Sequence, residues 1–452
     1  MTTHAVPTAT TPRRRARTVA TTVAGNFIEY FDWLIFGLYA PLLAQHFFPS
    51  ADPLTALLAV FVAYATGMLF RPLGGILMGS LADRRGRRLA LLLSISLMGG
   101  GSLVIGLLPT YASIGMAAPV LLFLARAAQG LSAGGEWPAA VSYLMELAPR
   151  NRRCLFGSIF AVSSAAGGLA ASALGMALSA TVGSQAMADW AWRVPFLAGA
   201  ALSAVLLVLR RQLGESEAFV RVRRSGPRPS LRRLWHDHRG AVVVAALFVV
   251  GVTVQTTTWT TVAPALAQSR FGLPADAVYA AVTASIALSI VVLIPLGLLA
   301  DRVGVLPMLV VSVIGFAVAG PFVLNGMSGG PGRLVLCLST GLFFMSCLTS
   351  VLPKIMASMF PTHLRASGIG LPHAVASSLA GGLTPALATW LAGHDRLGWY
   401  LGLLTVTALL AGVAGVRAVR RARPDGELPE EHGASAPEAT SPAPALVGSA
   451  RG

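Results

Sequence analysis

Long apolar stretches alternate with short polar turns along almost the whole chain, and this pattern predicts a helical membrane protein. A helix needs roughly twenty mostly apolar residues to cross the hydrocarbon core of a bilayer. Twelve stretches meet that length. They lie at about 19–45, 55–82, 89–109, 114–146, 155–181, 190–210, 240–267, 276–300, 305–325, 332–358, 366–392 and 397–418. The expected fold class is therefore an all-α integral membrane protein with twelve transmembrane helices.

The polar segments divide these spans into two groups of six. The longest polar segment between spans is 211–239, which is rich in arginine. We therefore expect two pseudo-symmetric six-helix bundles, at 19–210 and 240–420, joined by this cytoplasmic linker. A tail at 1–18 precedes them, and the tail at 421–452 is rich in Pro, Ala, Ser, Gly and Glu, a composition typical of disorder.

Cations are distributed unevenly among the predicted turns. Most of the 34 Lys and Arg residues fall in the N-terminal tail, in the linker and in alternate turns. The other turns hold Arg193, Arg270, Arg333 and Arg396. Because short cytoplasmic loops carry the excess of Lys and Arg, both ends of the chain are predicted to lie in the cytoplasm.

Composition agrees with a lipid environment. Hydrophobic residues make up 55% of the 452 residues and charged residues 12%, and the mean hydropathy is +0.69. A soluble domain of this length does not keep so few charges at its surface. The net charge of +16 is spread over short clusters between apolar spans, so nucleic acid is not an expected partner.

No enzymatic or metal chemistry is expected. Cys154, Cys337 and Cys347 lie in or beside apolar runs without ligand spacing, as packing residues do. The segment 130–134 matches the G-x-S-x-G turn of hydrolases, but that turn needs a strand before it, and here it lies within an apolar helix. The chain has no G-x-x-x-x-G-K-S/T phosphate loop. We expect neither a cofactor nor a metal.

Several charged residues lie deep inside the predicted spans, where a charge costs several kcal/mol unless it is paired or hydrated. At a rise of about 1.5 Å per residue, Asp32, Arg71 and Glu136 are about 20, 18 and 15 Å from the cytoplasmic ends of their helices. Glu29 lies three residues before Asp32, on the same helix face. Arg126 is closer to the outer side, with Gln129 one turn below it.

Two interpretations of this charged cluster remain open. In the structural one, a satisfied network of ion pairs holds the first, second and fourth helices together. In the functional one, Glu29, Asp32 and Glu136 are candidate proton carriers and Arg71 and Arg126 are their partners. A carboxylate that changes partners during a rocking motion can bind a proton on one side of the membrane and release it on the other.

The charge balance indicates the chemistry of a ligand. Three acids stand against Arg71, Arg126 and Lys354, so protonation of one acid leaves a net positive cavity that favours an anion, and a zwitterion also fits. Lys354 lies near a helix end, where it can extend to the interface. Histidine is the side chain whose ordinary pKa lies near neutrality, which makes His373 a candidate, although a lone histidine is more often structural. For Gln255 and Trp259, two roles remain equally open: packing between helices, or lining the cavity from the second half.

The turn between the second and third spans contains the most distinctive motif of the chain. It reads Gly79-x-x-x-Asp83-Arg84-x-Gly86-Arg87-Arg88 and recurs, without the final basic pair, as Gly297-x-x-x-Asp301-Arg302-x-Gly304. The first copy closely resembles the characteristic loop of the major facilitator superfamily, and the repeat at half-chain spacing indicates a duplicated fold. The resemblance implies a cytoplasmic gate loop formed by Gly79, Asp83, Arg84, Gly86, Arg87 and Arg88, with Asp301 and Arg302 in the second copy.

Four further segments, at 25–33, 71–75, 126–136 and 360–368, resemble the metabolite:H⁺ symporter family within that superfamily. The resemblance implies proton-coupled uptake of a small organic acid or zwitterion by alternating access. It also implies a monomer in a bacterial inner membrane and a role for Arg126 in proton transfer. The proton-coupling residues expected are Glu29, Asp32, Arg126 and Glu136. The substrate-binding residues expected are Asn26, Tyr30, Arg71, Gln129, Gln255, Trp259 and His373.

Two other functions are compatible with the same pattern. A proton antiporter that exports a drug or metabolite differs only in the direction of substrate movement. A transport-inactive ligand sensor needs a folded cytoplasmic output domain, and the sequence contains no such segment. The second half departs from the family pattern at Met359, at 305–307 and at 255–259. The identity of the transported compound is therefore the property that the resemblance to the family predicts least well.

Overall fold

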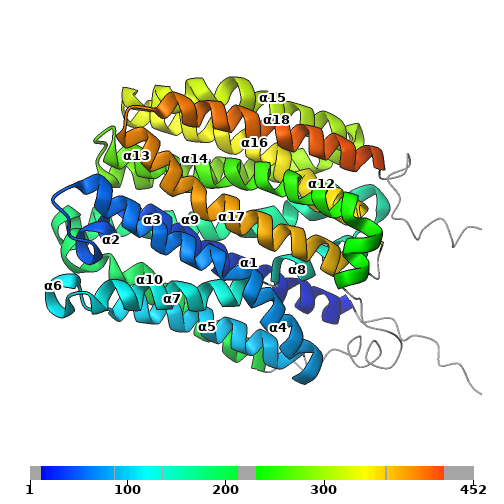
Figure 1. Cartoon of the computed structure of the whole chain (residues 1–452), viewed down its shortest axis with the longest axis horizontal. Coiled ribbons are helices and arrows are strands. Elements are labelled where there is room, and N and C mark those ends of the chain that lie inside the picture. Colours follow the sequence, from blue (N-terminus) through cyan, green and yellow to red (C-terminus); the bar gives the residue numbers. More distant parts are fainter. Residues whose placement is uncertain (1–11, 86, 135, 212–230, 362–363, 422–452) are drawn as a thin grey trace, which may run out of the picture.

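The structure is a computed structural model that describes residues 12–85, 87–134, 136–211, 231–361 and 364–421. Every regular element in these residues is a helix. Most of the predicted tails and linker, and Gly86 of the predicted gate loop, lie outside the described residues. The described chain begins and ends at the same end of an elongated bundle of roughly parallel helices (Figure 1). We call this the termini end and the other the opposite end.

The first half of the chain forms helices separated by short turns. They are α1 (Pro12–Leu38), α2 (Ala40–Phe47), α3 (Pro53–Leu69), α4 (Arg71–Arg85), α5 (Arg87–Leu107), α6 (Tyr111–Ile114), α7 (Ala117–Ala133), α8 (Glu136–Leu147), η1 (Arg150–Arg152), α9 (Arg153–Ala186), η2 (Met187–Ala191) and α10 (Arg193–Arg211). Where helices meet, the chain uses ordinary caps and breakers. For example, the Asp52 carboxylate accepts the Leu54 and Thr55 N–H groups at the start of α3.

The second half of the chain is also helical. Its elements are α12 (Leu231–Thr257), η3 (Thr258–Val262), α13 (Ala263–Ser269), α14 (Ala275–Val303), α15 (Val305–Gly326), η4 (Met327–Gly329), α16 (Pro331–Ser358), α17 (Arg365–Gly393) and α18 (Leu397–Arg421). The turn between α14 and α15 depends on Gly304, whose φ of +95° lies in the region that favours glycine.

All twelve predicted spans coincide with apolar helices. Nine helices in the described residues are long and apolar enough to cross a membrane, and α1 with α2 forms a further pair bent by 63°. The predicted spans at 114–146 and 305–325 contain shorter apolar helices, Ala117–Ala133 and Val305–Val318. The expectation of an all-α integral membrane fold is therefore confirmed.

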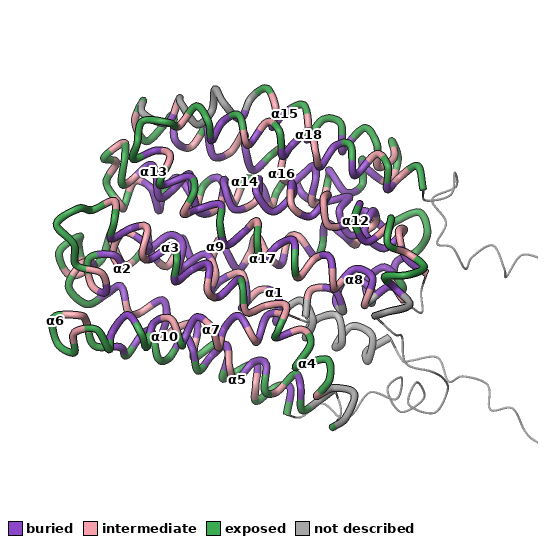
Figure 2. Tube along the Cα trace, viewed as in Figure 1, coloured by how far each residue is buried: buried purple, intermediate pink, exposed green. Residues whose placement is uncertain are grey.

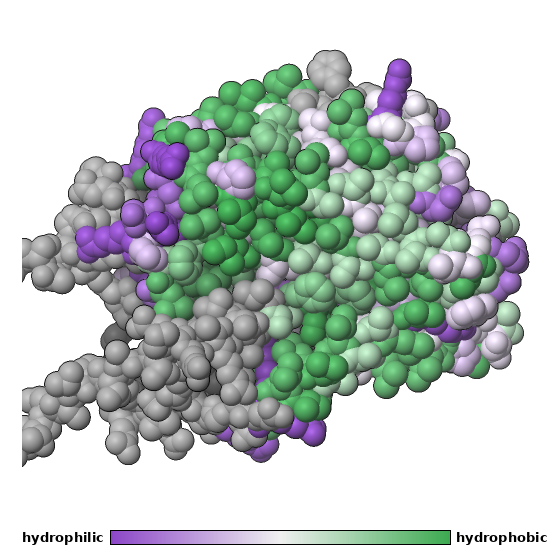
Figure 3. All heavy atoms as spheres, turned by 180° about the vertical axis from the view of Figure 1, so that it is seen from behind, coloured by the Kyte–Doolittle hydropathy of each residue, from purple (hydrophilic) through white to green (hydrophobic). Residues whose placement is uncertain are grey.

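The surface of the bundle matches that assignment. Figure 3 shows a broad hydrophobic band across the middle of one face, with hydrophilic residues gathered towards the two ends. Large apolar side chains are exposed on the bundle, among them Ile76, Leu107, Val291 and Leu336. Buried positions instead run along the sides of helices that face one another (Figure 2). Lipid is the solvent in which such a surface is stable.

Close packing of α7 against α3 and the start of α4 positions two of the predicted charges. A Cβ atom added at Gly134 would collide with the Arg71 carbonyl, and one added at Gly130 would collide with the Gly67 carbonyl. Glycine at these positions lets the two backbones approach until they touch. As a result, the second and fourth spans bring Arg71 and Arg126 to the same region of the first half.

The two halves contact each other at both ends of the bundle. At the termini end, the Asp301 carboxylate accepts the backbone N–H groups of Cys154 and Leu155, each at 2.9 Å. At the opposite end, the rings of Tyr39 and Tyr279 stack with their centroids 5.4 Å apart. These contacts join α9 to α14 and the end of α1 to α14, so the two halves touch near both ends in this conformation.

Candidate functional site

Asp32 lies at the centre of a hydrogen-bond network inside the first half. Its carboxylate is buried and accepts a hydrogen bond at each oxygen, from the Ser102 hydroxyl at Oδ1 and from Gln129 Nε2 at Oδ2, the second at 2.7 Å. Gln129 Nε2 is also 3.0 Å from Ser102 Oγ. The network therefore joins α1, α5 and α7 through one carboxylate.

Arg126 reaches Asp32 through Gln129. Its Nη1 atom donates to Gln129 Oε1 at 2.8 Å, whereas Arg126 Nη1 and Asp32 Oδ2 are 3.8 Å apart. The guanidinium is buried and lies over the Phe36 ring, 4.2 Å from its centroid. The amide is thus bonded to the cation on one side and to the anion on the other. Such a chain of bonds responds as a unit when the carboxylate changes its charge.

Glu29 and Arg71 form a second, direct ion pair. Arg71 Nη2 is 2.9 Å from Glu29 Oε1, and the guanidinium lies 4.3 Å from the centroid of the Trp33 ring. Trp33 in turn stacks on Tyr64 at 5.9 Å with an angle of 3° between the rings. Glu29 is buried and Arg71 is half-buried. The three-residue spacing of Glu29 and Asp32 therefore gives each acid its own arginine.

The two ion pairs enclose a small cavity of about 20 Å³. That volume has room for about one water molecule. Its walls come from α1, α3, α4, α5 and α7. They are Glu29, Asp32, Trp33, Gly67, Arg71, Met98, Arg126, Gln129, Gly130 and Ala133.

Two further candidates lie on α1 beside these pairs. Asn26 is buried, and its amide donates to the hydroxyls of Ser163 and Ser164, each at 2.7 Å, which ties α1 to α9. Tyr30 meets the edge of Trp33, with the ring centroids 5.9 Å apart. Both side chains border the charged region from the α9 side.

Part of the predicted site falls outside the side chains that the structure describes. α8 begins at Glu136, but nothing is described of that side chain. In the predicted gate loop, Gly79 is exposed. The other loop side chains predicted to form the gate lie outside those that the structure describes: Asp83, Arg84, Arg87 and Arg88. In the second copy, Asp301 binds the start of α9, and Arg302 is exposed.

Of the second-half candidates, Gln255 and Trp259 lie in neutral surroundings, whereas His373 lies close enough to Arg71 to feel its charge. The Gln255 amide donates to the Leu404 carbonyl at 2.9 Å, and Trp259 is buried against Phe316, with their ring centroids 6.4 Å apart. His373 on α17 stacks on Trp137 of α8 with centroids 4.0 Å apart, which places it between the halves. None of these three side chains lines the small charged cavity.

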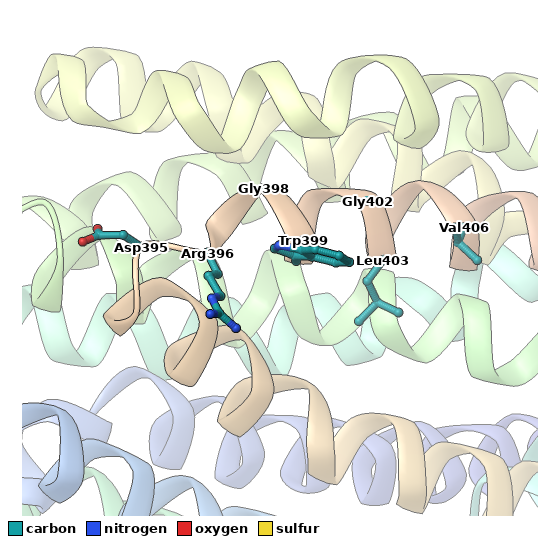
Figure 4. A pocket seen from close by; sticks show the side chains of 7 residues that line it. All are labelled: Asp395, Arg396, Gly398, Trp399, Gly402, Leu403 and Val406. Atoms are coloured by element: carbon teal, nitrogen blue, oxygen red, sulfur yellow. The ribbon is translucent and has the colours of Figure 1, made fainter.

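A larger hollow of about 710 Å³ lies elsewhere, beside the first turns of α18 (Figure 4). It is lined by Asp395, Arg396, Gly398, Trp399, Gly402, Leu403 and Val406. Trp399 is 75% exposed and the hollow opens to the outside of the bundle. It therefore belongs to the lipid-facing surface and not to the charged core.

Sequence reasoning did not identify Ser102. This serine follows three glycines in an apolar run, and small residues in such a run usually indicate close helix packing. Its spacing within α5 is unrelated to the charges on other helices. Only the fold brings it to Asp32, so no signal in the sequence could have found it.

A bundle of membrane-length helices with paired charges at its core, and with two halves that meet at both ends, defines a multi-pass membrane transporter. The chain belongs to the Major Facilitator Superfamily, whose family profile matches residues 22–293 and 248–450. The predicted resemblance to the metabolite:H⁺ symporter family within it is also confirmed by the relatives that follow.

Three relatives span nearly the whole chain. The α-ketoglutarate permease of Escherichia coli K12 is 33% identical over 422 residues, which cover 90% of this chain and 95% of the permease. The citrate-proton symporter of Salmonella typhi is 32% identical and covers 86% and 91%. The proline/betaine transporter of Salmonella typhimurium LT2 is 31% identical and covers 89% and 83%.

Solved structures support the fold. A crystal structure of a D-xylose-proton symporter matches with a TM-score of 0.68 at 15% identity, over 89% of this chain and 97% of the symporter. At that identity, the likeness extends to the arrangement of helices alone.

Proposed function

We propose that the protein is a proton-coupled secondary transporter that imports a small organic acid or zwitterionic metabolite by alternating access. The single observation that supports this most directly is the buried Asp32 network, in which Gln129 links the carboxylate to Arg126. Ionisable groups at membrane depth are expensive and are typical of proton and substrate pathways. The relatives add support, since their names specify citrate with protons, α-ketoglutarate, and proline or betaine.

Asp32 is the proposed proton-binding group. Glu29 is held by a direct ion pair with Arg71 at 2.9 Å, whereas Asp32 is held by two neutral donors and lies 3.8 Å from its arginine. Protonation of Asp32 removes the charge that Gln129 and Arg126 face, so the amide and the guanidinium become available to another acceptor. Glu136, at the start of α8, is a second candidate.

Arg71 is the proposed anchor for a substrate carboxylate. An incoming carboxylate replaces Glu29 at the guanidinium, and a zwitterion also offers its cation to the released Glu29 and to the Trp33 ring. The proton bound at Asp32 offsets the charge of an incoming carboxylate, so the net charge of the core is preserved, which makes the exchange inexpensive in a medium of low dielectric constant. The other proposed contacts are Asn26, Tyr30, Gln129, Gln255, Trp259 and His373.

The remaining features of the proposal concern topology. Two bundles at 19–210 and 240–420 rock about the central site, with both termini in the cytoplasm of a bacterial cell and one chain as the working unit. The loop around Asp83 to Arg88 and the second copy at Asp301 and Arg302 gate the cytoplasmic side. The bond from Asp301 to the start of α9 supports the second part of that assignment.

Uptake into proteoliposomes tests the function. Purified protein is reconstituted, a proton gradient (acid outside) is imposed, and accumulation of radiolabelled citrate, α-ketoglutarate, proline and glycine betaine is followed. We expect at least one compound to accumulate above its external concentration and to leak out after a protonophore is added. Protein-free liposomes are the control. Uptake that stops when the internal concentration equals the external one would contradict proton coupling. Proton-driven efflux from preloaded vesicles, in place of uptake, would identify an exporter.

A further inference from the structure

Two tyrosines close the opposite end of the bundle. Tyr39 lies at the bend between α1 and α2, and Tyr279 lies in the first turns of α14. Neither has any exposed surface. The rings are stacked at an angle of 15° with their centroids 5.4 Å apart. Since α1 belongs to the first half and α14 to the second, this contact must separate when the halves part at that end.

Both phenolic hydroxyls of this pair are buried without a hydrogen-bond partner among the described residues. A buried phenol that only fills space normally has a hydrogen-bond partner, because the desolvation cost of an unsatisfied hydroxyl exceeds the net stabilisation that a typical hydrogen bond provides. Tyr400 offers the comparison within this chain. It is equally buried, and its hydroxyl is 2.6 Å from Thr258 Oγ1.

The surroundings of the pair do not require the hydroxyls for packing. The Tyr39 ring meets Phe196 edge to face, with centroids 6.5 Å apart, a contact that phenylalanine would make equally well. The α9 backbone leaves space for the oxygen, because a Cβ atom at Gly175 would be only 2.7 Å from Tyr39 Oη. Packing in this conformation therefore does not account for the two hydroxyls.

We propose that Tyr39 and Tyr279 form an outer binding subsite that donates two phenolic O–H groups to a carboxylate of the transported compound when the opposite end opens. This inference rests on the proposed function. A phenol donates readily to a carboxylate, and such charge-assisted bonds are the stronger ones. The pair then holds the anion in transit, because Tyr39 lies about 10 Å along the helix from Asp32, at a rise of about 1.5 Å per residue. Stacking of the two rings behind the compound closes the end.

The experiment compares Tyr39→Phe and Tyr279→Phe with the matched control Tyr400→Phe. Initial uptake rates into proteoliposomes are measured against the external concentration of whichever of citrate, α-ketoglutarate, proline and glycine betaine the wild-type protein transports. Each interface variant is expected to raise the KM about tenfold with little change in the maximal rate, as the loss of one charge-assisted hydrogen bond does. A purely mechanical latch would change the maximal rate instead.

Thermal unfolding in detergent, without any added compound, provides the second measurement. Removing an unpartnered hydroxyl should leave the midpoint of Tyr39→Phe and Tyr279→Phe unchanged or higher, whereas Tyr400→Phe should lower it. Wild-type transport together with an unchanged KM in both interface variants would overturn the subsite and leave the proposed function intact. A lowered midpoint in both would show that the hydroxyls are bonded in the closed state, which also overturns it. Absence of transport and of ligand-induced stabilisation in the wild-type protein would overturn both proposals.

Discussion

The cores of the two halves use polar groups in opposite ways. In the first half, Asp32 and Arg126 are buried as charges and are joined through a glutamine. In the second half, the buried polar contacts at similar depth are neutral, as between Gln255 and the Leu404 carbonyl. Among the described residues of the second half, the buried charged side chain is that of Arg365. This residue is the first of α17 and lies at the termini end.

This difference assigns separate tasks to the halves. A charge that must be gained and lost needs a partner whose response is built into the surrounding network, and the first half provides one. A neutral core supplies shape and a surface against which the first half can move, without altering the charge balance. On the proposed function, the paired buried charges lie in the first copy of a duplicated fold, and the following substitutions test that separation.

The largest effect is expected from Asp32→Asn. The variant cannot bind a proton at this position, so the internal substrate concentration should no longer exceed the external one, while exchange of substrate across the membrane continues. Accumulation and counterflow in proteoliposomes measure the two properties separately. Asp189→Asn, at an exposed aspartate, is the control and should accumulate normally. Normal accumulation by Asp32→Asn would assign the coupling to another acid.

Arg71→Gln is expected to have the next largest effect. Loss of a charge-assisted bond corresponds to about 1.5–3 kcal/mol, so the KM for an anionic substrate should rise by about ten- to a hundredfold. Arg420→Gln, at an exposed arginine in the last turn of α18, is the control. Because Glu29 loses the charge of the Arg71 guanidinium, the double variant Glu29→Gln/Arg71→Gln should be more stable than Arg71→Gln alone. An unchanged KM would limit Arg71 to a structural role.

Gln129→Leu should have an intermediate effect. The substitution removes the amide that joins Asp32 to Arg126, so the maximal uptake rate should fall about tenfold, as expected for the loss of one bond to a charged group. The KM should change less. Rates measured over a range of substrate concentrations separate the two parameters, and Gln185→Leu, at an exposed glutamine, serves as the control. A rise in KM alone would make Gln129 a substrate contact only.

The smallest effect is expected in the second half, from Gln255→Leu. Its amide is bonded within its own half, so loss of this bond should lower the free energy of unfolding by about 1 kcal/mol. The KM should rise only about twofold, which corresponds to less than about 0.5 kcal/mol. Thermal unfolding and uptake assays measure the two quantities. A KM effect as large as that of Arg71→Gln would show that charge and recognition are not divided between the halves.

The sequence predicted the helices and the charged cluster because both depend on strong, local signals. Apolar stretches of membrane length are unambiguous, and acids three residues apart must share a helix face. The individual partners depend on contacts between helices distant in sequence. Nothing in the spacing of Ser102 or Tyr279 indicates that they meet Asp32 and Tyr39, because those contacts depend on how closely glycine-rich helices approach.

The small size of the cavity beside Asp32 has a consequence for ion selectivity. A space of about 20 Å³ holds about one water molecule, so a hydrated metal cation does not fit. The guanidinium groups of Arg71 and Arg126 line the same space and repel any cation that sheds its water shell. A proton needs no volume and can travel along hydrogen bonds. On the proposed function, the tight packing of the first half therefore favours a proton over sodium as the coupling ion, even where the carboxylates alone would attract sodium.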